Sequence, residues 1–147
     1  MRKTPYQKLI DRRRTWTPVQ TTAGKLKDGS EDVVRRALAI RHMELPVGEF
    51  IKEALEKTVP DHARKLLELN VQDEIKHDLA LGYVANAIGT DPTAEAEALR
   101  LRDAWEAHPD HTITKALVAE RAIFFVLLPL FRFCGDPGLR TVSADIS

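Results

Sequence analysis

Residues 66–88 read LLELNVQDEIKHDLALGYVANAI, and this stretch decides the fold class. One stripe at helical spacing is apolar at both ends and polar in the middle: Leu66, Asn70, Glu74, His77, Leu81, Val84 and Ile88. This periodicity predicts a helix with one face in the core of a helical bundle. Glu74 and His77 form an E-x-x-H pair one turn apart on that face, so both can reach the same metal ion or neighbouring ions.

A second helix is predicted before this stretch. Ser30 is its N-cap, acidic residues occupy its first turn, and the helical pattern runs to about Lys57. A bend is expected at Pro46-Val47-Gly48, where proline interrupts the pattern. Thr58-Val59-Pro60 ends this helix, and Asp61 is the predicted N-cap of the next.

Further helices are predicted after Gly89-Thr90, where the helix begun at Asp61 ends. Asp91-Pro92-Thr93 starts a charged helix to about Glu106, and 108–110 interrupts it. Another begins at Thr112 or Thr114 and continues through Phe133, and one more opens at Leu139. No strand-like alternation occurs, so the fold class is all-α, with long antiparallel helices.

The first 29 residues are expected to form a basic extended arm, and 30–147 a helical domain. Residues 1–30 hold eight Lys and Arg against two acids, +6, and the remainder balances this to a net charge of zero. The dense run Arg12-Arg13-Arg14 beside Trp16 indicates a solvated arm or a docking strand. Overall neutrality argues against nucleic acid as the main ligand.

The composition also predicts the redox environment of the chain and its relation to membranes. Cys134 is the single cysteine, so no internal disulfide can form, and a reducing cytoplasmic setting is the simplest expectation. The longest apolar run, 122–130, is too short to span a bilayer, and no signal-peptide pattern is present, so we expect no membrane partner.

Two more glutamates fall on apolar faces. Glu120 shares its face only with apolar residues: Ile113, Ala116, Leu117, Ile123, Phe124, Leu127, Leu128 and Phe131. Glu44 lies on the stripe of Ala37, Ile40, Val47, Ile51 and Leu55, whereas Glu49 shares its face with charged residues. An unpaired carboxylate in such a core costs several kcal/mol, so each must be protonated, paired or metal-bound.

The charge count favours a metal over a buried ion pair. The alternative pairs Glu74 with Lys76 or with an arginine from another helix. His77 is the only cationic candidate on the buried stripes, with Arg41 at the margin of the Glu44 face. Three glutamates with a neutral histidine are better balanced by two divalent cations.

The order of these ligands resembles the ferritin-like di-iron carboxylate superfamily. Over residues 31–147 the chain is similar to ribonucleotide reductase radical subunits, bacterial multicomponent monooxygenases and aldehyde-deformylating oxygenases. The resemblance rests on Val59-Pro60-Asp61 ahead of Glu74-Ile75-Lys76-His77, and on 117–125 around Glu120. It implies that Glu44, Glu74 and His77 hold one iron ion, and that Glu74 bridges to a second iron bound by Glu120. Manganese or a mixed pair would suit the same ligands.

Two features depart from this superfamily. Leu81 stands where tyrosyl-radical subunits carry a tyrosine, so a conventional radical subunit is not expected. The second E-x-x-H is missing: Glu44 and Glu74 are thirty residues apart, and thirty beyond Glu120 would be position 150, past Ser147. The bundle is therefore expected to be incomplete, with three long helices and the start of a fourth. Gene splitting, processing or truncation would each account for this end. If the end is natural, a second polypeptide would supply the rest of that helix and its ligands; pairing of two copies is the rival, and a higher oligomer is compatible with either.

The resemblance implies an O₂-activating di-iron oxidoreductase assembled with that partner. Its substrate pocket would be shaped by the apolar face of Ile123, Phe124, Leu127 and Leu128. The alternatives are a non-catalytic helical scaffold that has lost the metal and, less favoured, a ferroxidase or iron-storage protein.

Overall fold

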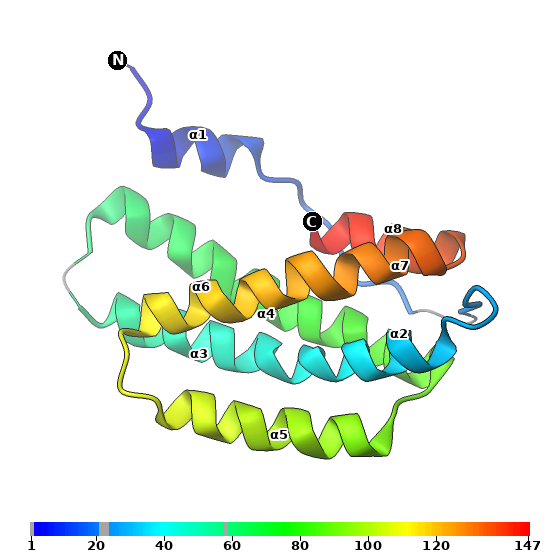
Figure 1. The fold of residues 1–147 in the computed structure, drawn as a ribbon. Coiled ribbons are helices and arrows are strands. Elements are labelled where there is room, and N and C mark those ends of the chain that lie inside the picture. The colour runs from blue at the N-terminus through cyan, green and yellow to red at the C-terminus, as the bar shows by residue number, and fades with distance from the viewer. Residues whose placement is uncertain (1, 21–23, 58) are drawn as a thin grey trace.

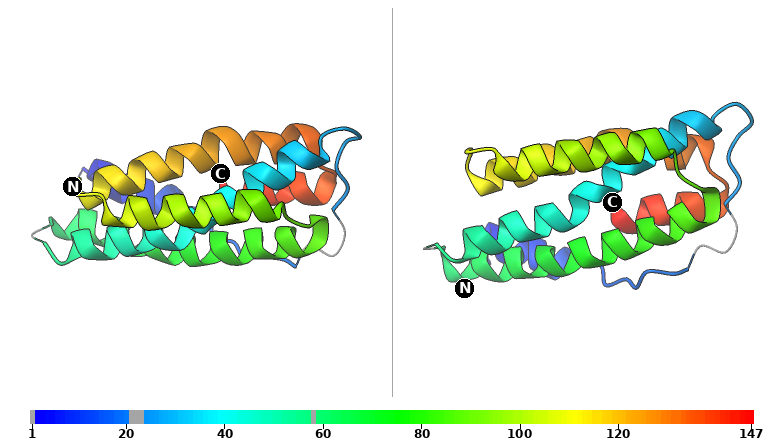
Figure 2. Two further views of the ribbon diagram at one scale, coloured as in Figure 1. Left: turned by 60° about the horizontal axis from the view of Figure 1, so that its bottom comes forward. Right: turned by 90° about the horizontal axis from the view of Figure 1, so that it is seen from below.

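The computed structural model describes residues 2–20, 24–57 and 59–147, and every regular element in these ranges is helical (Figure 1). The all-α class is therefore confirmed. Consecutive long helices run antiparallel (Figures 1 and 2). Helix α3 packs against both α4 and α6, and α5 packs mainly against η1. None of the described helices is long and apolar enough to cross a membrane.

The first long row of the bundle consists of α2 (Glu31–Leu38), the 3₁₀ segment η1 (Ala39–Met43) and α3 (Glu44–Leu55). The predicted bend at 46–48 was placed too late, because the irregular segment precedes Pro46. Proline has no N–H to donate to the carbonyl of residue 42, and its ring clashes with that carbonyl, so the distortion falls in the preceding turn. Ser30 stands at the N-cap position as predicted, but its hydroxyl donates to the Lys27 carbonyl instead of capping the helix.

The second row is α4 (Asp61–Ile88), which ends where Gly89 adopts a φ of 79°. The predicted end near Gly89-Thr90 is confirmed, since glycine tolerates this left-handed conformation. The N-cap is Pro60 rather than Asp61, whose carboxylate lies within the first turn. Of the predicted stop at 58–60, position 58 lies outside the described residues.

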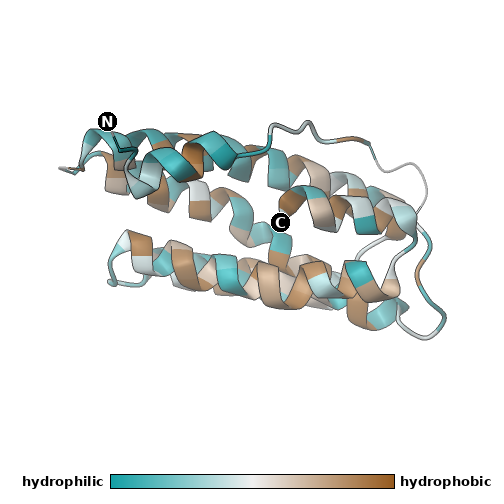
Figure 3. Ribbon diagram, turned by 90° about the horizontal axis from the view of Figure 1, so that it is seen from above, coloured by the Kyte–Doolittle hydropathy of each residue, from teal (hydrophilic) through white to brown (hydrophobic). Residues whose placement is uncertain are grey.

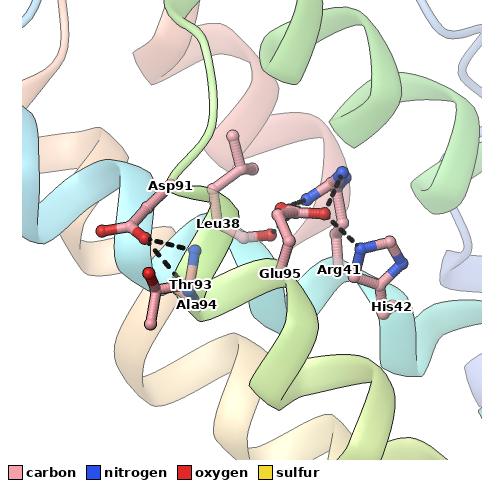
Figure 4. Close-up of polar contacts among 7 residues, drawn as sticks. All are labelled: Leu38, Arg41, His42, Asp91, Thr93, Ala94 and Glu95. Carbon is pink, nitrogen blue, oxygen red and sulfur yellow. Dashed lines mark hydrogen bonds and ion pairs between the residues drawn. The ribbon is translucent and has the colours of Figure 1, made fainter.

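Helix α5 (Pro92–Ala107) is joined to the first row by polar contacts. Asp91 caps it by accepting from the backbone N–H groups of Thr93 and Ala94, as Figure 4 shows. Glu95, in its first turn, accepts hydrogen bonds from Arg41 and contacts the ring of His42 on η1 (Figure 4). At the other end, the buried Lys115 ammonium donates to the carbonyls of Glu106 and His108.

The third row is α6 (Thr112–Ala122), the π-helical segment η2 (Ile123–Leu127) and α7 (Leu128–Cys134). The start at Thr112 is confirmed, and the ring of His111 accepts the capping bond from Ile113. The π turn lies just before Pro129, whose missing N–H disrupts the regular ladder. A final helix, α8 (Pro137–Ile146), is capped by Asp136 and folds back along α7.

The N-terminal segment is not extended throughout, which corrects one prediction. Residues Pro5–Arg12 form helix α1, because Thr4 accepts a capping bond from the backbone of Gln7 and Pro5 is preorganised for a first turn. Helix α1 packs against α4. Further along, Leu26 forms an isolated antiparallel bridge with Gly135.

The core consists of two apolar clusters with polar ligand-type residues between them. One cluster joins α2, the second half of α4, α7 and α8 through residues such as Leu38, Leu81 and Phe131. The other joins α3 to α6 through Val47, Phe50 and Ala116. Figure 3 shows hydrophobic residues recurring along the rows while α1 is mainly hydrophilic.

Candidate metal centre

Three of the four predicted ligands converge. Glu44 is the first residue of α3, and Glu74 and His77 lie near the middle of α4. Ligand-type atoms of all three lie within 4.8 Å of one another. The residues are 0%, 2% and 6% exposed, respectively. The packing of α3 against α4 therefore creates a buried Glu-Glu-His group that could hold a metal ion.

Five buried side-chain atoms of Glu44, Glu74, His77 and Glu120 lack hydrogen-bond partners in the described structure. They are both carboxylate oxygens of Glu44, Oε2 of Glu74 and Nδ1 of His77, together with Oε2 of Glu120. Nδ1 of His77 lies 3.4 Å from Glu44 Oε2 and 3.6 Å from Glu74 Oε2, too far for ordinary hydrogen bonds. Buried polar groups are normally hydrogen-bonded, so these unsatisfied oxygen and nitrogen atoms are available to bind an ion.

The cations that might have balanced these glutamates are engaged elsewhere. Arg41, the candidate at the margin of the Glu44 face, donates to Glu95 at 2.8 Å. Lys76 lies over the ring of Trp16, and no ion pair between Glu74 and a lysine or arginine occurs among the described residues. His77 is therefore the only cationic side chain paired with Glu44 and Glu74 in the described part of the chain.

The electrostatics of the metal-free group follow from burial and crowding. Burial opposes the charged form of His77, but the carboxylates of Glu44 and Glu74 outweigh it and raise its pKa to about 10. Burial raises the pKa of Glu74 to about 6, with His77 opposing and Glu44 reinforcing the change. Burial, together with the charge of Glu74, raises the pKa of Glu120 to about 8. Crowded, desolvated carboxylates of this kind are stabilised by a cation.

Glu120 lies outside the three-residue group but beside Glu74. It lines one large cavity of about 630 Å³ together with Glu74 and His77. Its face is only partly buried, which corrects the expectation of an enclosed apolar stripe. Ala116, Ile123, Leu127, Leu128 and Phe131 are buried, but Ile113, Leu117 and Phe124 are exposed. Phe124 lines the cavity, so this face of α6 borders open space instead of packing against α4.

The basic run near the N-terminus docks across this cavity. Arg13 forms an ion pair with Asp73 and donates to the Leu69 carbonyl at 2.9 Å. Arg14 binds Asp145 and the Ala144 carbonyl at the end of α8. Arg13 and Arg14 therefore attach this run to α4 and α8, although the side chain of Arg14 is 60% exposed.

Trp16 is the site residue that sequence reasoning missed. Its ring stacks against His77, with centroids 5.8 Å apart and planes 19° from parallel. The only sequence signal was its place beside the arginine run, because no periodicity links residue 16 to residue 77. Asp73, one residue before Glu74, is paired with Arg13.

Two of the three ligand-bearing rows are irregular next to the centre. η1 ends at Met43, one residue before Glu44, and η2 begins three residues after Glu120. Short 3₁₀ and π segments within long helices often mark functional positions.

No family model matches the chain, and comparisons with curated proteins and with solved structures find no match.

Proposed function

We propose that Glu44, Glu74, His77 and Glu120 bind a pair of divalent transition-metal ions in a ferritin-like oxidoreductase that activates O₂. The observation that carries this proposal is the meeting of buried, unbonded ligand atoms from α3, α4 and α6, with no lysine or arginine paired to Glu44 or Glu74 among the described residues. Three carboxylates and one imidazole suit iron or manganese, which accept mixed oxygen and nitrogen ligands.

The arrangement of the residues supports two ions rather than one. Glu44 and His77 lie with Glu74 in one group, whereas Glu120 approaches Glu74 from the cavity side. Glu44 and His77 would hold one ion, Glu120 would hold the other, and Glu74 would contribute to both. Both ions would sit between the two apolar clusters of the core.

When bound, such a metal pair supplies redox chemistry toward O₂, and the chain's own residues supply the environment. The carboxylates of Glu44, Glu74 and Glu120 would bind in their ionised form and His77 as a neutral imidazole. The ring of Trp16 stacks on one face of His77. Phe124 places an apolar wall beside Glu120, where a substrate could approach.

The four residues leave coordination positions for further ligands, and the cavity adjoins them. We propose that a second polypeptide inserts a helix into this space, between α4 and α6, with carboxylate and imidazole ligands of its own. The cavity of about 630 Å³ is lined by charged and polar side chains as well as by Phe124, and Leu117 is exposed on α6. These features support an amphipathic helix as the occupant.

The test is metal analysis with titration of Fe²⁺ and Mn²⁺ into the full chain. Glu44→Gln should abolish tight binding, because it removes a buried charged ligand while keeping the shape of the side chain. Glu49→Gln is the matched control, since Glu49 lies on the same helix but pairs with Lys52 at the surface. Equal metal binding by the Glu44→Gln variant and the native chain would show that Glu44 is not a metal ligand and would contradict the proposed metal centre.

The proposed partner has its own test. The isolated chain should bind fewer than two ions per monomer or bind the second weakly, and co-expression with the partner should complete the pair. A well-folded monomer that binds two ions by itself, measured by metal analysis with sedimentation velocity, would exclude the partner. A two-ion site found only in a dimer of identical chains would favour self-pairing.

A metal-free helical scaffold is the second candidate, and one observation favours it. His77 lies between Glu44 and Glu74, at 3.4 and 3.6 Å, where an imidazolium would balance part of their charge. This candidate requires that neither Fe²⁺ nor Mn²⁺ binds in any assembly of the chain. The same titration therefore separates a retained metal centre from a scaffold.

A further inference from the structure

We propose that a separate apolar pocket between α5, η1 and α6 binds a small hydrocarbon group, either a single aromatic ring or a short alkyl chain. The pocket has a volume of about 270 Å³. Its walls are all apolar or aromatic side chains: Ile40, Met43, Ala98, Leu101, Trp105, Val118, Ala119 and Ala122.

The polarity of the walls selects the ligand class. The indole N–H of Trp105 already donates to the Lys115 carbonyl at 3.2 Å, so it is not free for a ligand. The thioether of Met43 is soft and contacts aromatic rings favourably. A ligand with a hydroxyl or carboxylate would leave that group without a partner inside the pocket, which costs free energy. Hydrocarbon is therefore the class that fits.

The volume is consistent with a small ligand. Apolar cavities of about 150 Å³ in other proteins stay dry and bind benzene or xenon. A pocket of about 270 Å³ can take a substituted ring or a chain of comparable size. Leu101 and Val118, each 51% exposed, lie at the rim and leave an entrance.

Two polar ties hold the pocket open at its ends. Glu95 binds Arg41 and contacts His42, which fixes the start of α5 to η1 (Figure 4). Lys115 and Trp105 fix the end of α5 to α6. Between these ties the lining residues Ala98, Ala119 and Ala122 are too small to fill the gap between the helices. The space is therefore a consequence of how α5 is anchored.

The pocket is distinct from the candidate metal centre. Ala119 and Ala122 line the pocket, whereas Glu120 lines the large cavity, so the two spaces lie on different faces of α6. Met43 and Ala119 directly precede Glu44 and Glu120 in the chain, so an occupant would contact the backbone segments that carry two of the proposed ligands. Ligand binding here requires no metal and stands whether or not the proposed function holds.

The experiment uses bromobenzene as the probe, because its heavy atom quenches tryptophan fluorescence on contact. In the Trp16→Phe protein, Trp105 is the remaining tryptophan. Quenching of Trp105 should saturate as bromobenzene is added, since the pocket offers one site. A linear, non-saturating response equal to that of free tryptophan would show collision alone and overturn the proposal.

A filled pocket provides the specificity control. Ala98→Leu in the same background should weaken bromobenzene binding at least about tenfold, because the added isobutyl group occupies the space that the probe needs. Ala96→Leu adds the same group on the exposed side of α5 and should leave binding unchanged. Circular dichroism and thermal unfolding verify that both variants fold. Saturable binding unaffected by Ala98→Leu would place the site elsewhere.

Self-association of the chain through the pocket must be distinguished from ligand binding. Sedimentation velocity across the concentrations used should show the same mass with and without bromobenzene. If a second copy of the chain covers Leu101 and Val118, the mass will double and quenching will be suppressed as protein concentration rises. That result would assign the surface to an interface and overturn the ligand site.

Discussion

At the scale of single residues, Glu44 and Glu49 show how one residue type takes opposite roles on one helix. Glu49 lies at the surface, with its side chain 68% exposed and paired with Lys52. Glu44 is fully buried, and neither carboxylate oxygen has a hydrogen-bond partner in the described structure. A buried group without partners lowers stability, so its presence is best explained by binding.

Glu44→Met should therefore stabilise the metal-free chain and abolish metal binding together. Methionine keeps a similar volume and removes the unsatisfied carboxylate, so we expect the free energy of unfolding to rise by about 1–3 kcal/mol. Urea denaturation in the presence of a chelator measures this change. Glu49→Met is the surface control. A loss of stability in the Glu44→Met variant would instead mean that Glu44 is needed structurally as a partner of His77.

At the scale of elements, α5 is held less by apolar packing than by polar contacts at its two ends. No residue of α5 is fully buried. Lys115, 5% exposed, donates to two carbonyls at the C-terminus of α5 and lies 4.4 Å from the centre of the Phe50 ring. A cation at a helix C-terminus is favoured by the helix dipole. Glu95 fixes the opposite end.

Lys115→Met should lower the free energy of unfolding by about 2–3 kcal/mol, because the carbonyls of Glu106 and His108 lose their charged donor. Chemical denaturation followed by circular dichroism measures the loss. Lys65→Met, at an exposed position of α4, is the control. Equal stability of the Lys115→Met variant and the native chain would show that water replaces the ammonium without cost.

Glu95 makes the docking of α5 dependent on pH. Burial raises its pKa, but the charges of Arg41 and His42 outweigh burial, and the net effect is a pKa below the usual value. The stabilisation is therefore fully present above the unfolded pKa of about 4.3 and is lost as pH falls through the lower folded pKa. Glu95→Gln should remove this acid-dependent part of the unfolding free energy.

Denaturation of the native chain and the Glu95→Gln variant between neutral pH and about pH 3 measures the difference. The two curves should converge at the acidic end, where the native Glu95 is also protonated. Glu97→Gln, an exposed position on the same helix, should follow the native curve. Parallel curves for the Glu95→Gln variant and the native chain would contradict the assigned role of Glu95.

At the scale of the whole molecule, the candidate metal centre lies between two apolar clusters that belong to different helices. Residues before Glu74 on α4, such as Val71, pack with one cluster, and residues after His77, such as Leu81, pack with the other. Along the first row the change falls near Glu44: Leu38, before it, packs with the cluster that contains Leu81, and Val47, after it, packs with the cluster that contains Val71. A bound ion would therefore connect α3, α4 and α6 at the boundary of both clusters.

Metal should raise the stability of the whole chain. A ligand at one hundred times its dissociation constant adds about 2.7 kcal/mol to the free energy of unfolding. Thermal unfolding with added Fe²⁺ under anaerobic conditions, or with Mn²⁺, should show this increase in a single transition. Glu74→Ala should abolish the increase, and Glu68→Ala, exposed on the same helix, should keep it. No shift with either ion would argue for the scaffold.

The sequence by itself determined most helix limits and three of the converging site residues. Asp91, Gly89 and Thr112 mark helix ends because capping and glycine geometry act within one turn. Helical phase placed Glu44 on a buried stripe and Glu49 at the surface, since a face depends only on local periodicity. Where local signals competed, as at Pro46 and at Thr4-Pro5, the limits were misplaced.

Only the tertiary structure decided which distant residues meet. Arg41 could have balanced Glu44 but binds Glu95, and Trp16 covers His77 although the two lie far apart in the sequence. The exposed side of Glu120's face likewise follows from where α4 and α8 lie, not from the pattern on α6. Periodicity describes one helix at a time, whereas partners and cavities depend on the positions of several helices packed together.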